Sequence, residues 1–226
     1  MATIASGITG GFSGKSGPVV GYYRLGKWCM RGLPKKSTKN KRGTSAQKES
    51  RSIFTKTQYL LSPILSFIRV GFNMEARAKQ MTAHNLAKSY NMLNAFNPDG
   101  KLDYSRVLVS SGKLPGALEQ VVAQDDMGLH FSWKDIPGES RALDSDQVML
   151  LAFDATAFEH NSESKNANHK KKEAYYMISG ARRKAHTETL EIPSSAKGHS
   201  LHTYISFISD DRECVSISTY VGEIVF

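Results

Sequence analysis

The residues nearest the N-terminus contain the ending of a phosphate-binding loop. Residues 10–16 read Gly-Gly-Phe-Ser-Gly-Lys-Ser, and such loops close on Gly-Lys-Ser. The spacing is wrong for nucleotide binding, because the first glycine of the motif falls on Thr9. Further glycines follow Ser16 where the motif needs a helix, whose N-terminus supplies the N–H groups that hold phosphates. The sequence therefore argues against a nucleotide site.

Histidine and cysteine, which often act as metal ligands or nucleophiles, lack partners at useful spacing. His199 and His202 are too few ligands for zinc, which needs three or four, and we expect both on a surface turn. Cys29 lies in a glycine-rich segment, and Cys214 has no cysteine or histidine at zinc spacing. We therefore expect two reduced, unreactive thiols and no metal site.

Adjacent carboxylates occur at Asp125-Asp126 and at Asp210-Asp211, in both cases where a turn is expected. Aspartates in turns more often accept local hydrogen bonds than act in acid–base catalysis. No Gly-x-Ser-x-Gly elbow marks a serine nucleophile. The sequence thus predicts no catalytic residues, no cofactor and a protein that is not an enzyme.

Positive charge is concentrated in the first quarter of the chain. Residues 1–56 carry twelve basic side chains against Glu49 alone, a net charge of +11, whereas residues 57–226 carry 18 basic and 20 acidic side chains, a net charge of −2. Cations neutralise phosphates, and the interleaved Tyr22, Tyr23 and Trp28 can stack on bases. The segment predicts contact with nucleic acid or another anionic surface, with a solvated, solubilising surface as the alternative. The candidate nucleic-acid-binding residues are Arg24, Lys27, Arg31, Lys35, Lys36, Lys39, Lys41 and Arg42.

The elements that must position these cations begin with a glycine-rich basic arm, residues 1–43. Glycine spacing disfavours a helix here and suits extended backbone, so we expect two short strands over Val19–Tyr23 and Lys27–Arg31. Such an arm has little core of its own, and it must dock on the rest of the molecule, dock on another copy or stay mobile. We expect arm conformation and docking to depend on Gly14, Gly17, Gly21, Trp28 and Pro34.

Residues 44–100 are expected to form a helical hairpin. Thr44 and Gln47 fit a capping box, after which apolar residues recur at helical spacing, and Pro63 predicts a kink or break near Ser62. A second helix is expected from Met74 to about Ala95. The turn tetrapeptide at residues 97–100, Asn-Pro-Asp-Gly, ends it.

From residue 101 to residue 226 the periodicity changes to short alternating runs, which predict an antiparallel β-sandwich of the fibronectin type III or immunoglobulin-like kind. The fold class is therefore α+β, with a β-arm and a helical hairpin ahead of the sandwich. A basic cluster, residues 169–172 with residues 182–184, either extends the cationic patch or is a solvated loop. The expected strands are Tyr104–Ser110, Leu118–Val122, Met127–Trp133, Gln147–Asp154, Ala174–Ile178, Thr187–Ile192, His202–Ile208 and Val215–Val225.

Several motifs resemble, in order, those of an uncharacterised bacterial family, a domain of unknown function. They are Gly14–Gly21, Arg31–Lys36, Gln47 with Arg51 and Phe54, Asp103–Ser105, Leu114–Ala117, Phe131–Trp133, Leu190–Pro193 and Val215–Gly222. The resemblance covers nearly the whole chain. It supports the expected fold boundaries and implies no activity. One departure is the loop Asn161–Lys172, which is longer and more basic than the family pattern.

Length and composition limit the functional classes. A chain of 226 residues forms one or two domains, and it has neither an 18-residue apolar run for a membrane span nor a secretory signal. We expect a cytoplasmic protein, free or incorporated in a particle. The first hypothesis is a non-catalytic structural or self-associating protein of a phage-like or other mobile-element particle, acting as a homo-oligomer. Sequence-nonspecific nucleic-acid binding by the basic segment is the alternative, and a protein-binding adaptor stays open.

Overall fold

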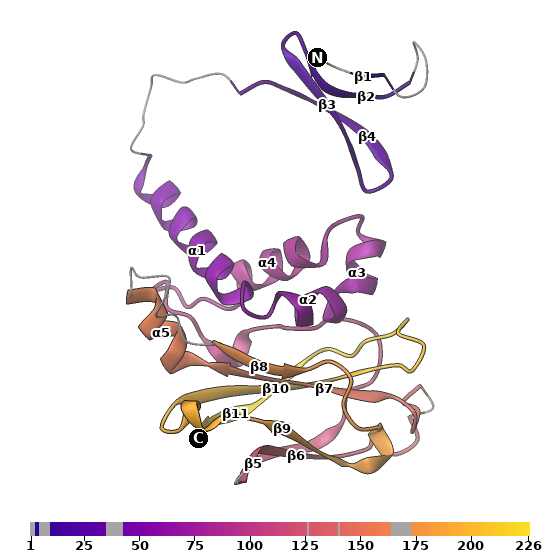
Figure 1. The fold of residues 1–226 in the computed structure, drawn as a ribbon, viewed down its shortest axis with the longest axis vertical. Coiled ribbons are helices and arrows are strands. Elements are labelled where there is room, and N and C mark those ends of the chain that lie inside the picture. The colour runs from indigo at the N-terminus through magenta and orange to yellow at the C-terminus, as the bar shows by residue number, and fades with distance from the viewer. Residues whose placement is uncertain (1–2, 5–9, 35–42, 126, 140, 164–172) are drawn as a thin grey trace. The chain divides into compact units, whose positions relative to one another are not determined.

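The computed structural model describes residues 3–4, 10–34, 43–125, 127–139, 141–163 and 173–226 (Figure 1). The chain divides into two compact units, Met1–Lys48 and Glu49–Phe226. The boundary falls in the first turns of helix α1, Ser45–Leu61. In the part of the chain that the structure describes, no helix is long and apolar enough to cross a membrane.

The first unit holds a four-stranded antiparallel sheet, which we call the N-terminal sheet. Its strands, in spatial order, are β1 (Thr3–Ile4), β2 (Phe12–Ser16), β3 (Val19–Arg24) and β4 (Lys27–Gly32). The two strands expected from the sequence, β3 and β4, are confirmed. Gly17 has a φ of 55° between β2 and β3, where a left-handed conformation suits glycine. Leu25 and Gly26, with φ of 48° and 79°, close the β3–β4 hairpin, and this pair of positive angles is the geometry of a type I′ turn.

The helical stretch begins as its capping box predicts. The Thr44 N–H lies 3.2 Å from Gln47 Oε1 and donates to it, and the Gln47 N–H donates to Thr44 Oγ1 at 3.3 Å. Helix α1 ends at Leu61, two residues before Pro63, and α2 covers Leu65–Gly71. The expected break near Ser62 is therefore confirmed.

The expected single helix from Met74 to Ala95 is wrong, and so is the two-helix hairpin. The chain forms α3 (Asn73–Ala78) and then α4 (Ala83–Asn94), separated by Gln80 with a φ of 53°. The Met81 N–H donates to the Ala76 carbonyl at 2.9 Å, which closes α3, and Thr82 caps α4 by accepting from the Asn85 N–H at 3.3 Å. The turn after α4 is confirmed, since the Gly100 N–H donates to the Asn97 carbonyl at 2.8 Å.

Two antiparallel sheets complete the second unit. One has the order β5-β6-β9, and the other has the order β11-β10-β7-β8. The strands are β5 (Leu118–Asp125), β6 (Gly128–Lys134), β7 (Gln147–Asp154), β8 (Ala174–Met177), β9 (Thr187–Glu191), β10 (Ser200–Ile208) and β11 (Thr219–Val225), with helix α5 (Ala155–Glu163) after β7. The strand expected over Tyr104–Ser110 is wrong, because this stretch begins with a 3₁₀ turn, Tyr104–Arg106, started by Asp103, whose carboxylate accepts from the Ser105 N–H at 3.1 Å.

The four-stranded sheet of the second unit is the middle one of three layers (Figure 1), and its central strands β7 and β10 are buried on both faces. Along β7, Met149, Leu151 and Phe153 pack into one core with α1–α4, whereas the alternate residues at 148, 150 and 152 pack into another with the β5-β6-β9 sheet. Strand β7 therefore reads as a continuous apolar run, as expected for a strand covered on both sides.

A buried arginine lies beside the core between the two sheets of the second unit and contacts several segments of the chain. The Arg183 guanidinium is 1% exposed and donates to the Gly116 carbonyl at 2.6 Å and to the Pro115 carbonyl at 2.8 Å. It also lies 3.4 Å from the fully buried Asp146 carboxylate and 4.0 Å from the centre of the Phe207 ring. Arg183 is buried, so both alternatives for residues 182–184, an extension of the cationic patch and a solvated loop, are wrong for this residue. Residues 169–172 lie outside the described residues.

Candidate functional site

Three of the expected nucleic-acid contacts come together on the N-terminal sheet. Arg24 lies on β3, and Lys27 and Arg31 lie on β4. In this register Arg24 pairs with Lys27, and Val20 pairs with both Arg31 on β4 and Lys15 on β2. Because residues directly opposite in an antiparallel sheet share a face, and alternate residues along a strand return to it, Lys15, Arg24, Lys27 and Arg31 lie on one face. Lys35, Lys36, Lys39, Lys41 and Arg42 lie outside the described residues.

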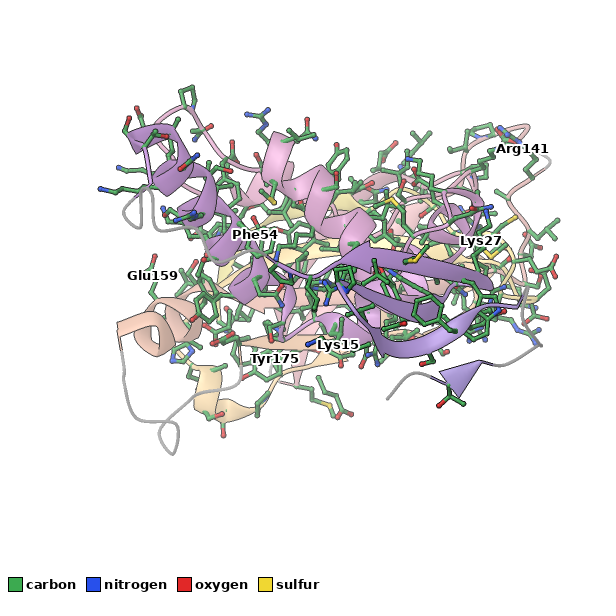
Figure 2. All side chains as sticks on the ribbon, turned by 90° about the horizontal axis from the view of Figure 1, so that it is seen from above. Lys15, Lys27, Phe54, Arg141, Glu159 and Tyr175 are labelled. Carbon is green, nitrogen blue, oxygen red and sulfur yellow. The ribbon has the colours of Figure 1, made fainter. Side chains whose placement is uncertain are left out.

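We call this surface the basic face. Figure 2 labels Lys15 on β2 and Lys27 on β4. Tyr22 belongs to the same face, since it is two residues from both Val20 and Arg24 along β3, and it pairs with Cys29 on β4. Residues 1–48 contain no aspartate or glutamate. The positive charge of the basic face therefore has no carboxylate within its own unit to oppose it.

The opposite surface, the apolar face, carries Phe12, Val19, Tyr23, Trp28 and Met30. Tyr23 pairs with Trp28 across β3 and β4, and their rings meet edge to face with centroids 5.1 Å apart. These side chains stay accessible in the chain, because Tyr23 is 60% exposed, Trp28 43% and Met30 65%. The apolar face thus leaves three large apolar side chains exposed to solvent.

Glycines permit this face to pack as tightly as it does. Gly21 is buried, and a Cβ there would overlap the Phe12 carbonyl and ring. A Cβ on Gly11 would overlap the Trp28 indole. Gly14, with a φ of 109°, lies opposite Gly21, and Pro34 is exposed after β4. Of the five residues expected to set the arm's conformation and docking, Gly14, Gly17, Gly21 and Trp28 thus have a defined local role in the sheet.

The expected surface turn at the two histidines is wrong. His199 Nδ1 lies 2.6 Å from the buried Asp154 Oδ2, whose other oxygen caps α5 by accepting from the Ala157 N–H at 2.7 Å. His202 lies within β10 and is buried, with its ring stacked on Tyr104 at a centroid distance of 3.8 Å. Burial lowers the pKa of His202. Among the described residues, no group of three potential metal ligands comes together.

The Asp210-Asp211 turn is confirmed. Asp211 Oδ1 accepts from Ser209 Oγ at 2.5 Å and from the Glu213 N–H at 2.9 Å, and these hydrogen bonds lower the pKa of the Asp211 carboxyl. The Gly-Lys-Ser motif lies in β2 and is followed by a tight turn rather than a helix, so it builds no cradle for phosphates.

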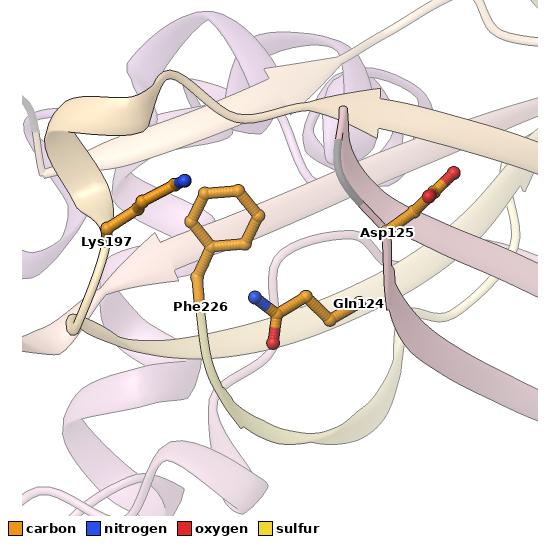
Figure 3. A pocket seen from close by; sticks show the side chains of 4 residues that line it. All are labelled: Gln124, Asp125, Lys197 and Phe226. Atoms are coloured by element: carbon orange, nitrogen blue, oxygen red, sulfur yellow. The ribbon is translucent and has the colours of Figure 1, made fainter.

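A shallow pocket of about 320 Å³ lies in the second unit, lined by Gln124, Asp125, Lys197 and Phe226 (Figure 3). It joins the end of β5 to the C-terminus. Of the residues expected to bind or react, it contains only Asp125, so it gathers no constellation that points to a reaction.

The sequence-based set of candidate cations lacks Lys15, which the register adds to the basic face. The sequence predicts Tyr22, Tyr23 and Trp28 alike as stacking residues and does not separate the two faces of the sheet. The alternation of side chains along β3 separates Tyr22 and Arg24 from Tyr23. Reading β3 with a period of two could have found this division.

The fold thus defines an α+β protein with three antiparallel sheets, of which the N-terminal one has an apolar and a basic face. The chain belongs to a family of unknown function, DUF6266, whose model matches residues 11–222. This finding confirms the resemblance inferred from the sequence motifs. Searches of the curated proteins and of the solved structures found no match.

Proposed function

We propose that this protein is a non-catalytic, self-associating structural protein, which forms a homo-oligomer through its N-terminal sheet. The observation that carries the proposal is the apolar face, on which Tyr23, Trp28 and Met30 are all more than two-fifths exposed. Exposed apolar area of this kind is stabilised by contact with another surface.

A second copy fits the chemistry of the N-terminal sheet. Its cations all lie on the basic face, so two apolar faces can meet without burying a charge. The edge strands β1 and β4 each pair with one neighbour among the described strands. An edge strand with free N–H and C=O groups is a template for pairing with another chain.

We propose further that the two sheets of the second unit are a fibronectin type III or immunoglobulin-like sandwich. Support comes from their seven antiparallel strands, three on one sheet and four on the other. The connections β6–β7, β8–β9 and β9–β10 cross between the sheets, whereas β5–β6, β7–β8 and β10–β11 join neighbouring strands of one sheet, in the case of β7–β8 through helix α5. Such a rigid body presents the sheet of each copy in an assembly. We propose a cytoplasmic phage-like or other mobile-element particle as its setting.

The test is the molar mass of the full chain by size-exclusion chromatography with light scattering. We expect an oligomer that survives 1 M salt. The double substitution Trp28→Ser with Met30→Ser should raise its dissociation constant at least tenfold, and deletion of residues 1–33 should abolish it. The matched control, Val20→Ser with Cys29→Ser on the basic face, should leave the oligomer intact. A parent chain that is monomeric at high concentration contradicts self-association.

Sequence-nonspecific nucleic-acid binding is the second candidate function. The observation that favours it is the shared face of Lys15, Arg24, Lys27 and Arg31 in a unit without carboxylates. Such binding weakens steeply with salt, because it is driven by release of counterions from the phosphates. Salt-insensitive binding to a labelled oligonucleotide would count against it.

A further inference from the structure

We propose that the basic face binds single-stranded nucleic acid, with Tyr22 as the platform on which a base stacks between two pairs of cations. The proposal rests on the second candidate function and is independent of self-association through the apolar face. Its ligand is chemically defined as a flexible polyanion that carries accessible aromatic bases.

The register of the sheet places the cations in two pairs. Arg24 and Lys27 are directly opposite one another on β3 and β4, next to the hairpin turn. Lys15 and Arg31 flank Val20 from its two neighbouring strands, so they are about 10 Å apart across the sheet. Along β3, Val20 and Arg24 are about 13 Å apart, since four residues rise about 3.3 Å each.

Tyr22 lies midway between these pairs on the same face. It is half-buried, so part of the residue stays accessible. Its cross-strand partner, Cys29, and its neighbour on the face, Val20, are small and uncharged. A strand whose phosphates follow the two cation pairs therefore brings a base over Tyr22.

A single strand suits this surface better than a duplex. Base pairing and stacking hide the base faces of a duplex, so the Tyr22 ring gains nothing from it. Single strands expose these faces, and stacking of a base on an aromatic side chain is sequence-tolerant. Contacts of the cations with phosphates and stacking on Tyr22 do not depend on base identity, so we expect binding without sequence preference.

The test measures binding of the full chain to three probes by fluorescence anisotropy or competition: a 20-nucleotide oligo-dT, a 20-base-pair duplex and inorganic polyphosphate. We expect the oligo-dT to bind at least tenfold more tightly than the duplex at equal salt. Tyr22→Ala should weaken oligo-dT binding at least fivefold and leave polyphosphate binding within twofold. Tyr22→Phe, which keeps the ring, should bind oligo-dT as the parent does.

The cations are tested by a matched pair of fourfold variants. The first changes Lys15, Arg24, Lys27 and Arg31 to Gln, and the control changes four exposed lysines of the second unit, Lys101, Lys113, Lys184 and Lys197, to Gln. The first should weaken oligo-dT binding at least tenfold and reduce the slope of log K against log salt by about 3, because each neutralised phosphate of a single strand contributes about 0.7. The control should keep the parent's slope.

Three outcomes overturn the proposal: equal loss in the two fourfold variants, duplex binding as tight as oligo-dT binding, or a Tyr22→Ala variant that binds like Tyr22→Phe. Light scattering without nucleic acid, run on the same variants, separates the two functions. An oligomer that is lost while oligo-dT binding is kept rejects self-association alone. Circular dichroism at 215 nm confirms that each variant keeps its strands.

Discussion

The N-terminal sheet and the four-stranded sheet of the second unit each have four antiparallel strands. They differ in burial, because the side chains of the first are mostly exposed and those of the central strands of the second are buried. Strand β7 is buried on both faces by large apolar side chains, whereas the only buried residue that the structure describes in the first unit is Gly21. The difference lies in what covers each face. Helices and a second sheet cover β7, while the N-terminal sheet has glycines at its closest contacts and cations on one face. A sheet packed between two layers buries its apolar side chains, and the N-terminal sheet has no second layer within its own described residues.

The largest expected effect comes from the buried arginine of the second unit. Arg183→Leu leaves the Asp146 carboxylate buried without its cation and removes the donors to the carbonyls of Pro115 and Gly116. We expect a loss of about 3–5 kcal/mol in the free energy of unfolding, measured by urea denaturation. The neighbouring Arg182 is exposed, so Arg182→Leu should change it by less than about 0.5 kcal/mol. If Arg183→Leu costs no more than Arg182→Leu, the buried pair does not stabilise this unit.

A smaller and strictly local effect is expected in the N-terminal sheet. In Gly21→Val the new side chain meets the Phe12 carbonyl and ring, so β2 has to move away from β3. We expect amide hydrogen exchange in β2 and β3 to speed up at least tenfold, with the free energy of unfolding of the second unit unchanged within about 0.5 kcal/mol.

Gly32→Val is the matched control in the same sheet, because a Cβ at Gly32 meets open space. It should leave the exchange rates as they are. A lower free energy of unfolding of the second unit, or faster exchange within its strands, on Gly21→Val would contradict the comparison between the two regions.

How much of the fold was predictable differs between elements for physical reasons. Alternation and turn residues located most strands of the second unit, and the capping box and Pro63 located both ends of α1. The single helix over 74–95 failed because a left-handed residue, Gln80, breaks it, and glutamine carries no signal for that conformation. The sequence did not predict helix α5, because its N-cap residue, Asp154, is also the last residue of β7. The apolar run of the strand therefore hides the start signal of the helix.

The candidate site was predictable in composition and not in arrangement. The excess of cations over residues 1–56 follows from counting. The placing of Lys15 and Arg31 on either side of Val20 depends on register, which the turns at Gly17 and at residues 25–26 set. The prediction for Arg183 was wrong for a different reason. Its place in a basic cluster predicts an exposed cation, but the carbonyls of residues 115–116, far away in sequence, accept its hydrogen bonds and make its burial possible.

The capping box at the boundary between the two units should contribute less again. Thr44→Ala removes the oxygen that accepts from the Gln47 N–H, so the first turn of α1 frays. We expect a loss of about 1 kcal/mol in local stability, measured as faster amide exchange over the first turn of α1. Ser52→Ala, at an exposed position within α1, should slow that exchange or leave it unchanged, because alanine favours helix. Equal exchange in Thr44→Ala and the parent would mean that this cap does not hold α1.

The smallest expected effect is confined to acidic pH and concerns His202. Burial lowers the folded-state pKa of this ring, which stacks on Tyr104 and lies 3.0 Å from the Tyr220 hydroxyl, while Glu223 acts weakly in the opposite direction. The unfolded chain therefore takes up a proton first as pH falls below about 6.5, so the stability that neutral His202 contributes is present above that pH and is lost as pH falls through the folded-state pKa. In His202→Phe this loss is absent, and its deficit in unfolding free energy relative to the parent should narrow between pH 7 and pH 5. A deficit that stays constant over this range would show that His202 is not the group that couples the second unit to pH.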